Sequence, residues 1–121
     1  MAKIVVLKTE GKGAPAAERE RKPAEKVIAG PIDTTTWNQW SGDGDRLNSG
    51  IWESSVGKWT VDYDVWEFCH FIAGKAVLTS ESGESWTIKA GEAFVIEPGF
   101  KGTWETVEPI RKHYVILASQ E

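Results

Sequence analysis

The chain has 121 residues, in which 14 Lys and Arg stand against 18 Asp and Glu for a formal net charge of −4. This length gives room for one domain with one core, which can be stable without disulfides or metal. A mildly acidic protein offers no electrostatic footprint for phosphate backbones or anionic lipid, so we expect neither nucleic acid nor a membrane as a partner. The single cysteine, Cys69, cannot form an intrachain disulfide, which fits a reducing cytoplasm.

The first 26 residues predict a flexible arm. Residues 4–7 are apolar but too few for a signal peptide or a membrane span, and they could form a short strand on this subunit or on a neighbour. Residues 8–26 mix both signs of charge with Gly, Ala and Pro, which is typical of a solvated, mobile segment. We therefore expect a soluble, cytoplasmic protein with an extended arm at residues 1–26 and a folded domain at residues 27–121.

Beyond the arm, short runs rich in Val, Ile, Thr and aromatic residues alternate with clusters of Gly, Pro, Asn and Asp. This pattern predicts strands at residues 50–55, 58–63, 66–73, 76–80, 85–89, 93–96, 102–106 and 111–118, with a tight hairpin around Gly83. A short helical turn could form at residues 34–40, although no helical period supports it. Short strands at this spacing predict an all-β sandwich or barrel.

The segment 59–74 resembles the first cupin motif, in which a His-x-His pair is followed by Glu and then by Gly. Glu67 and Gly74 have the spacing of the last two positions. The two histidine positions fall on Thr60 and Asp62 or, with a spacing shorter by one residue, on Val61 and Tyr63.

Residues 91–102 echo the second cupin motif, and its histidine position is Gly102. The chain resembles one family of small single-domain cupins, described by the cupin domain of (S)-ureidoglycine aminohydrolase. The short segments that carry the resemblance are 50–53, 67–70, 91–96, 99–105 and 111–116. The resemblance spans roughly residues 35–118. It implies a cupin-type double-stranded β-helix, which is a jelly-roll barrel, and a homodimer. The manganese ligands of that aminohydrolase are not reproduced, so we expect a metal-free or weakly metal-binding pocket.

The resemblance to the cupin motif implies that Glu67 lies at the centre of this pocket. If Glu67 faces the barrel interior, then Cys69 and Phe71 do too, whereas Phe68, His70 and Ile72 face away. His70 is therefore not expected to bind metal, and the facing of the last strand, which carries His113, stays open.

Two interpretations of Glu67 remain open. A carboxylate desolvated among aromatic rings suits proton transfer, which would make Glu67 an acid–base catalyst. Alternatively, Glu67 hydrogen-bonds a buried Tyr63, a Trp indole or Lys112 and stabilises the fold. We expect Cys69 to be inert, because a carboxylate two residues away raises the pKa of its thiol.

A weakly bound divalent ion is a further option. Asp62, Glu67 and Cys69 could hold it, with Glu53 or Glu105 assisting, and oxygen ligands would favour a hard cation.

Seven tryptophans are many for so small a domain, and several could line a cavity or an interface, although core packing is the alternative. The residues that we expect to bind a small molecule, with Glu67, are Trp52, Trp59, Asp62, Tyr63, Cys69, Phe100, Trp104 and Lys112. We prefer a small-molecule-binding protein. An enzyme of nitrogen, ureide or carbohydrate metabolism and a dimeric scaffold protein are the alternatives.

Overall fold

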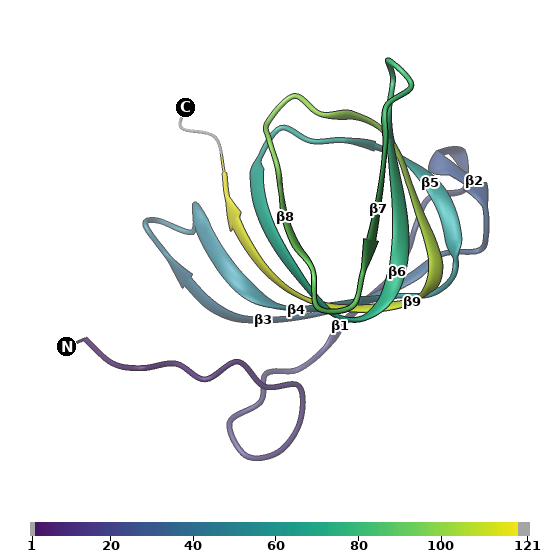
Figure 1. Cartoon of the computed structure of the whole chain (residues 1–121). Coiled ribbons are helices and arrows are strands. Elements are labelled where there is room, and N and C mark those ends of the chain that lie inside the picture. Colours follow the sequence, from purple (N-terminus) through teal and green to yellow (C-terminus); the bar gives the residue numbers. More distant parts are fainter. Residues whose placement is uncertain (1, 119–121) are drawn as a thin grey trace.

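The computed structural model describes residues 2–118, which form nine strands and one short 3-10 turn (Figure 1). The elements are β1 (Glu18–Arg21), η1 (Ala24–Lys26), β2 (Val27–Ala29), β3 (Asp33–Gly42), β4 (Leu47–Ser54), β5 (Gly57–Asp62), β6 (Trp66–Ser80), β7 (Ser85–Lys89), β8 (Ala93–Ile96) and β9 (Lys101–Leu117). The expected all-β class is confirmed. Over the described range, the structure has no helix with the length and apolar character needed to cross a membrane.

All strand pairs are antiparallel, and the long strand β9 organises them. One edge of β9 pairs with β4 and with β5, and its other edge pairs along almost its whole length with β6. β1 and β3 extend the sheet beyond β4, β2 pairs with β5, and β7 and β8 each pair with β6. Figure 1 shows that the sheet curls into a barrel, with β6 and β9 running through its wall.

The bend of β6 depends on Gly74. The register between β6 and β9 shifts repeatedly from Phe71 to Ala76, as expected for bulges that increase curvature. Gly74 has a φ of 94°, and a Cβ there would overlap the carbonyl group of Pro109 on β9. Only glycine fits both the backbone angle and the close approach.

The predicted strands are largely confirmed. β7 and β8 have the predicted bounds. Segments 66–73 and 76–80 belong to one strand, β6, and segments 102–106 and 111–118 both contribute to β9, because bulges bend these strands without ending them. The helical turn considered for residues 34–40 is wrong: this segment lies in β3, where the β-branched run 34–36 pairs with β4.

The arm also differs from expectation. Residues 4–7 form no strand on this chain, and Ile4 is largely exposed, whereas a strand on a neighbouring subunit stays a prediction. Residues 18–21, which the sequence placed in the arm, form β1 on the edge of β3. Polar contacts hold residues 8 and 9 on the barrel, since Lys8 donates its backbone N–H to Gln39 and Arg111 donates to Thr9. Part of the predicted arm is therefore built into the sheet.

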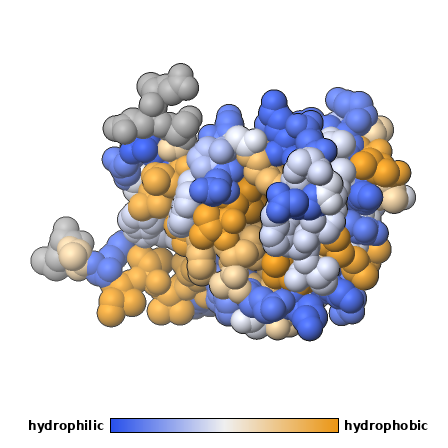
Figure 2. Space-filling model, turned by 45° about the horizontal axis from the view of Figure 1, so that its top comes forward, coloured by the Kyte–Doolittle hydropathy of each residue, from blue (hydrophilic) through white to orange (hydrophobic). Residues whose placement is uncertain are grey.

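The core fills the barrel with apolar and aromatic side chains from β5, β6, β8 and β9 and from the segment between β2 and β3. The buried cluster comprises Ile32, Trp59, Phe71, Ala76, Leu78, Ile96, Trp104 and Ile110. The indole of Trp104 donates to the Thr106 hydroxyl at 3.0 Å, which satisfies its buried N–H. Some large apolar side chains also reach the surface, and Figure 2 shows such patches between hydrophilic residues.

Candidate ligand pocket

A cavity of about 630 Å³ opens within the barrel, lined by residues of β3, β4, β5, β6 and β9 and by the segment that contains β1 and η1. Its lining includes Glu67 on β6 and Lys112 on β9, two buried residues of opposite charge. Glu67 faces inward because it alternates with the half-buried Trp66 and Phe68 along the strand. The pocket is therefore a polar site inside an aromatic barrel.

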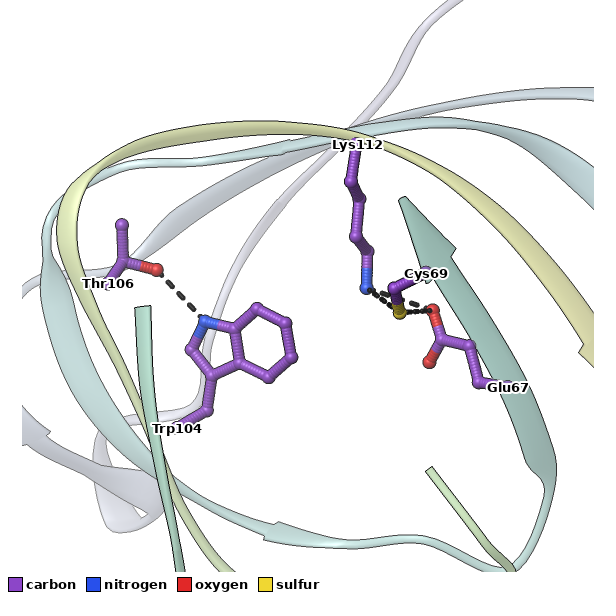
Figure 3. Close-up of polar contacts among 5 residues, drawn as sticks. All are labelled: Glu67, Cys69, Trp104, Thr106 and Lys112. Carbon is purple, nitrogen blue, oxygen red and sulfur yellow. Dashed lines mark hydrogen bonds and ion pairs between the residues drawn. The ribbon is translucent and has the colours of Figure 1, made fainter. Parts of the chain in front are cut away.

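Glu67 and Lys112 form a buried ion pair. Nζ of Lys112 lies 2.9 Å from Oε2 of Glu67, and the two residues are only 3% and 5% exposed. The same ammonium donates to Sγ of Cys69 at 3.3 Å, and the Cys69 thiol donates to Oε2 of Glu67 at 3.4 Å (Figure 3). Burial of two charges is tolerated only when they are paired and hydrogen-bonded, as they are here.

Three tryptophans surround this pair. The ammonium of Lys112 lies 4.5 Å from the ring centroid of Trp52 and 4.8 Å from that of Trp104, within the range of a cation–π interaction. Trp59 stacks on Trp104 with centroids 5.9 Å apart. Trp104 and Trp59 are buried, whereas Trp52 is half-buried, and all three line the cavity.

The ion pair keeps Lys112 charged. Burial, the largest single cause, lowers the pKa of Lys112, but the charge and hydrogen bond of Glu67 together with Cys69 and Tyr63 outweigh it, and the net shift is upward. The amine is therefore protonated at neutral pH and is not available as a nucleophile.

Cys69 is inert, as expected. Burial is the main cause that raises the pKa of its thiol to about 12, and the charge of Glu67 adds to it, whereas Lys112 acts in the opposite direction. A thiol in this state supplies no thiolate near neutral pH.

Two phenols share the pocket with the pair. Burial and then the charge of Glu67 raise the pKa of Tyr63 above its usual range. The same two causes raise the pKa of Tyr114 to about 12, and its hydroxyl donates to Oδ1 of Asn38 at 2.7 Å. Both phenols stay protonated and can act as hydrogen-bond donors.

The structure brings together most of the predicted residues. Those that line the pocket are Trp52, Trp59, Asp62, Tyr63, Glu67, Trp104 and Lys112. Asp62 is exposed at the rim, and Cys69 lies behind Glu67 and Lys112 without lining the cavity.

The structure corrects the prediction that Phe100 lines the pocket with Glu67. The ring of Phe100 lies 6.1 Å from that of Trp86, and it lines a different groove, between β7 and β8. Phe100 ends the turn before β9 and lies outside the strand, so strand alternation could not place it.

Sequence reasoning missed several pocket residues, namely Glu18, Lys22, Lys26, Asn38 and Tyr114. Tyr114 follows Lys112 by two residues on β9, so alternation could have found it. Glu18 lies in β1, Lys26 in η1 and Asn38 in β3, and Lys22 lies between β1 and η1. No strand was predicted for any of these segments.

Comparison with known proteins identifies the family. The EutQ-like cupin domain model matches residues 41–114, more than half of the chain. This chain belongs to the EutQ-like cupin domain family. The jelly-roll cupin fold expected from the sequence is thereby confirmed, whereas the narrower resemblance to ureidoglycine aminohydrolase is not shown. No curated protein matches this cupin in sequence.

Solved structures agree with the cupin fold. A protein of unknown function from Pseudomonas syringae pv. tomato has a TM-score of 0.76 at 20% identity over 87% of this chain and 46% of its own. The cupin thus spans less than half of that protein. A DUF861 family protein from Thermotoga maritima is 36% identical over 53% of this chain and 73% of its own, with a TM-score of 0.52. The EutQ protein of Clostridium difficile has a TM-score of 0.65 at 17% identity, over 84% of this chain and 75% of its own.

The metal site of metal-binding cupins does not fit this cupin. On β5, Thr60 and Asp62 are exposed while Val61 is half-buried against the core, so the inward positions follow the shorter motif spacing and fall on Val61 and Tyr63. Gly102 pairs with Val61, and a Cβ there would overlap the carbonyl oxygen of Thr79, which leaves no room for histidine.

The remaining acidic candidates are also dispersed. Glu53 forms an ion pair with Arg111 and lines a separate groove, and Glu105 alternates with the buried Trp104, which directs it away from the core. They therefore cannot assist Asp62, Glu67 and Cys69 as ligands. Within residues 2–118, no three His, Cys, Asp or Glu side chains cluster in a way that could hold a metal ion.

His70 and His113 lie on the outer face of the cupin barrel. Their rings stack with centroids 5.9 Å apart, since the two residues are opposite each other on β6 and β9. Burial, the neighbouring His70 and then Arg111 lower the pKa of His113. His70 faces away from the pocket, as predicted, and the facing of His113, which the sequence left open, is now fixed.

Proposed function

We propose that this cupin is a metal-independent small-molecule-binding protein that holds its ligand above the Glu67–Lys112 pair. The observation that carries the proposal is the ammonium of Lys112, 2.9 Å from the motif carboxylate. In a metal-binding cupin this carboxylate would bind the ion. Here a side chain supplies the positive charge, so the pocket needs no metal for electrostatic balance.

The size and lining of the cavity also support ligand binding. A volume of about 630 Å³ lies in the usual range for small-molecule sites. Such sites combine aromatic walls with a few fixed polar groups, and Trp52, Tyr114 and Glu67 provide both.

Tryptophan fluorescence of the full chain tests the proposal. A panel of small polar molecules should contain a ligand that changes the emission saturably, and Trp52→Ala should weaken its binding by about tenfold. Trp86→Phe is the matched control, since Trp86 lines a different groove, and it should leave the affinity unchanged. Near-stoichiometric Mn, Fe, Ni or Zn in protein purified without chelator would contradict metal independence, and failure of the whole panel would contradict ligand binding.

An enzyme of ureide or carbohydrate metabolism is the second candidate. It is favoured by Oε1 of Glu67, which accepts from neither Lys112 nor Cys69 and could take a proton from a substrate. The same panel, followed for product formation with the full wild-type chain, distinguishes the two candidates, because only an enzyme converts a bound ligand into a product.

A homodimer is part of the proposal. The outer face of β6, β8 and β9 exposes Ile72, Val95 and Leu117 near the His70–His113 stack. Apolar side chains gathered on one face are typical of a surface that pairs with another chain.

A further inference from the structure

One carboxylate oxygen of the pocket keeps acceptor capacity for a ligand. Oε2 of Glu67 accepts from both Lys112 and Cys69, whereas Oε1 accepts from neither of them. The phenol of Tyr63, in the same lining, hydrogen-bonds the Glu67 carboxylate, which still has lone pairs for a further donor. In Figure 3, Oε1 points away from both partners. Glu67 lines the cavity although it is 95% buried, so a strong acceptor in a desolvated setting faces any bound molecule.

The lysines near this oxygen already interact with carboxylates and aromatic rings. Lys112 is held by Glu67 and by the indoles of Trp52 and Trp104. At the rim, Lys22 lies 3.6 Å from Glu20 and 5.5 Å above the ring of Trp59.

The negative charges of the lining are less compensated. The carboxylates that line the cavity are Glu18, Asp62, Asp64 and Glu67, and only Glu67 forms an ion pair within residues 2–118. Lys26 is the one lining lysine without an ion-pair partner in the same range. The unpaired groups of the pocket therefore carry more negative than positive charge.

The field inside the pocket agrees with this balance. Besides burial, the charges of Glu67 and Glu18 both raise the pKa of Tyr114, so the phenol lies within reach of two carboxylates. Glu67 comes from β6 and Glu18 from the edge strand β1, so the two negative charges come from separate parts of the lining.

The aromatic wall favours the same kind of ligand. Trp52 is half-buried and lines the cavity, and an indole face attracts cations. An anion would meet carboxylates and a lysine that is already paired, so it would lose hydration without a compensating contact.

We propose that the pocket binds a small organic cation with N–H donors, of the guanidinium or ammonium class, that donates to Oε1 of Glu67 and rests on Trp52. This inference rests on the proposed ligand-binding function and narrows it to one chemical class. Glu18, contributed by β1, stabilises the bound charge at a distance.

Three probes of nearly equal shape test the charge preference on the full chain. They are n-propylguanidinium, the neutral n-propylurea and the anion butyrate, compared at one ionic strength by isothermal titration calorimetry. The cation should bind about tenfold or more tightly than the urea, and butyrate should not bind measurably. Raising the salt concentration should weaken binding of the cation and leave that of the urea unchanged.

Two variants of exposed carboxylates separate an effect of charge on binding from an effect on folding. Glu18→Gln removes an exposed carboxylate and should weaken binding of the guanidinium several-fold without changing the melting temperature. Glu84→Gln removes an exposed carboxylate that does not line the cavity, and as the matched control it should leave the affinity unchanged.

Three outcomes would overturn the inference: urea or butyrate binds as tightly as the cation, Glu18→Gln has no effect on binding, or none of the three probes binds. The proposed ligand binding fails separately, when the wider fluorescence panel also yields no ligand.

Discussion

The two faces of β6 place polar side chains in opposite environments, one buried and one partly solvated. On the inner face, Glu67 and Cys69 are buried and bonded to Lys112. On the outer face, His70 is half-buried and stacks on His113, while Ile72 is exposed. One step along the strand thus separates a buried charge that requires a partner from a surface group that water can solvate.

The difference shows that a charged side chain needs a bonded partner on the inner face but not on the outer face. An inner charge has no water to stabilise it, so its partner has to come from another strand, as Lys112 does from β9. An outer imidazole is partly solvated by water, so its charged form does not depend on a partner from another strand. Variants of the inner face should therefore have large effects on stability, and variants of the outer face small ones.

The largest effect should follow from breaking the inner pair. Glu67→Gln preserves the shape of the side chain but leaves the ammonium of Lys112 buried without its counter-charge. We expect a loss of about 3–5 kcal/mol in the free energy of unfolding, measured by urea denaturation. Glu81→Gln, an exposed carboxylate in the turn after β6, is the matched control and should change stability by less than about 0.5 kcal/mol.

A double variant shows whether the loss comes from the unpaired charge. Glu67→Gln combined with Lys112→Met removes both charges and should be less destabilised than Glu67→Gln alone. Additive losses would mean that the two side chains act independently, contrary to the ion pair.

The next effect should appear at alkaline pH. The pKa of the Cys69 thiol is raised from 9.0 to about 12, so the folded thiol keeps its proton where the unfolded thiol has lost it. This stability is fully present below pH 9 and falls above it, by about 1.4 kcal/mol per pH unit from this group. The raised pKa values of Tyr63, Tyr114 and Lys112 act with the same sign at higher pH.

Cys69→Ala isolates this contribution. The variant should keep a nearly constant stability to about pH 10, where tyrosines begin to ionise, whereas the wild type should start to lose stability near pH 9. Urea denaturation at intervals between pH 8 and 11 measures both curves. Identical slopes would show that the thiol ionises equally in the folded and the unfolded chain.

Much of this contrast could be predicted from the sequence. The period of two along residues 67–72 assigned every side chain of that segment to the correct face. The partner of Glu67 could not be chosen from sequence, because Lys112 is 45 residues away and bulges shift the register between β6 and β9.

The missed strands have different physical causes. β1 is a charged segment, ERER, that forms only because β3 offers it an edge. β3 carries polar threonines and asparagine on a strand that borders the pocket, so its apolar period is weak. Both strands form because they pair with strands distant in the sequence, and the local sequence does not encode that pairing.

The smallest effect is expected on the outer face, at acid pH. Burial and the neighbouring His70 lower the pKa of His113 below its ordinary value of 6.5, so its stabilising contribution is present above pH 6.5 and is lost as the pH falls through the lowered pKa. Because the ring is largely solvated, the loss between pH 7 and 5 should stay below about 1 kcal/mol. NMR titration of the His113 ring should show its pKa rising in His70→Gln, but not fully to 6.5, since burial remains. An unchanged pKa would mean that the stacked rings do not interact electrostatically, and sedimentation over the same pH range would show whether protonation also separates the proposed dimer.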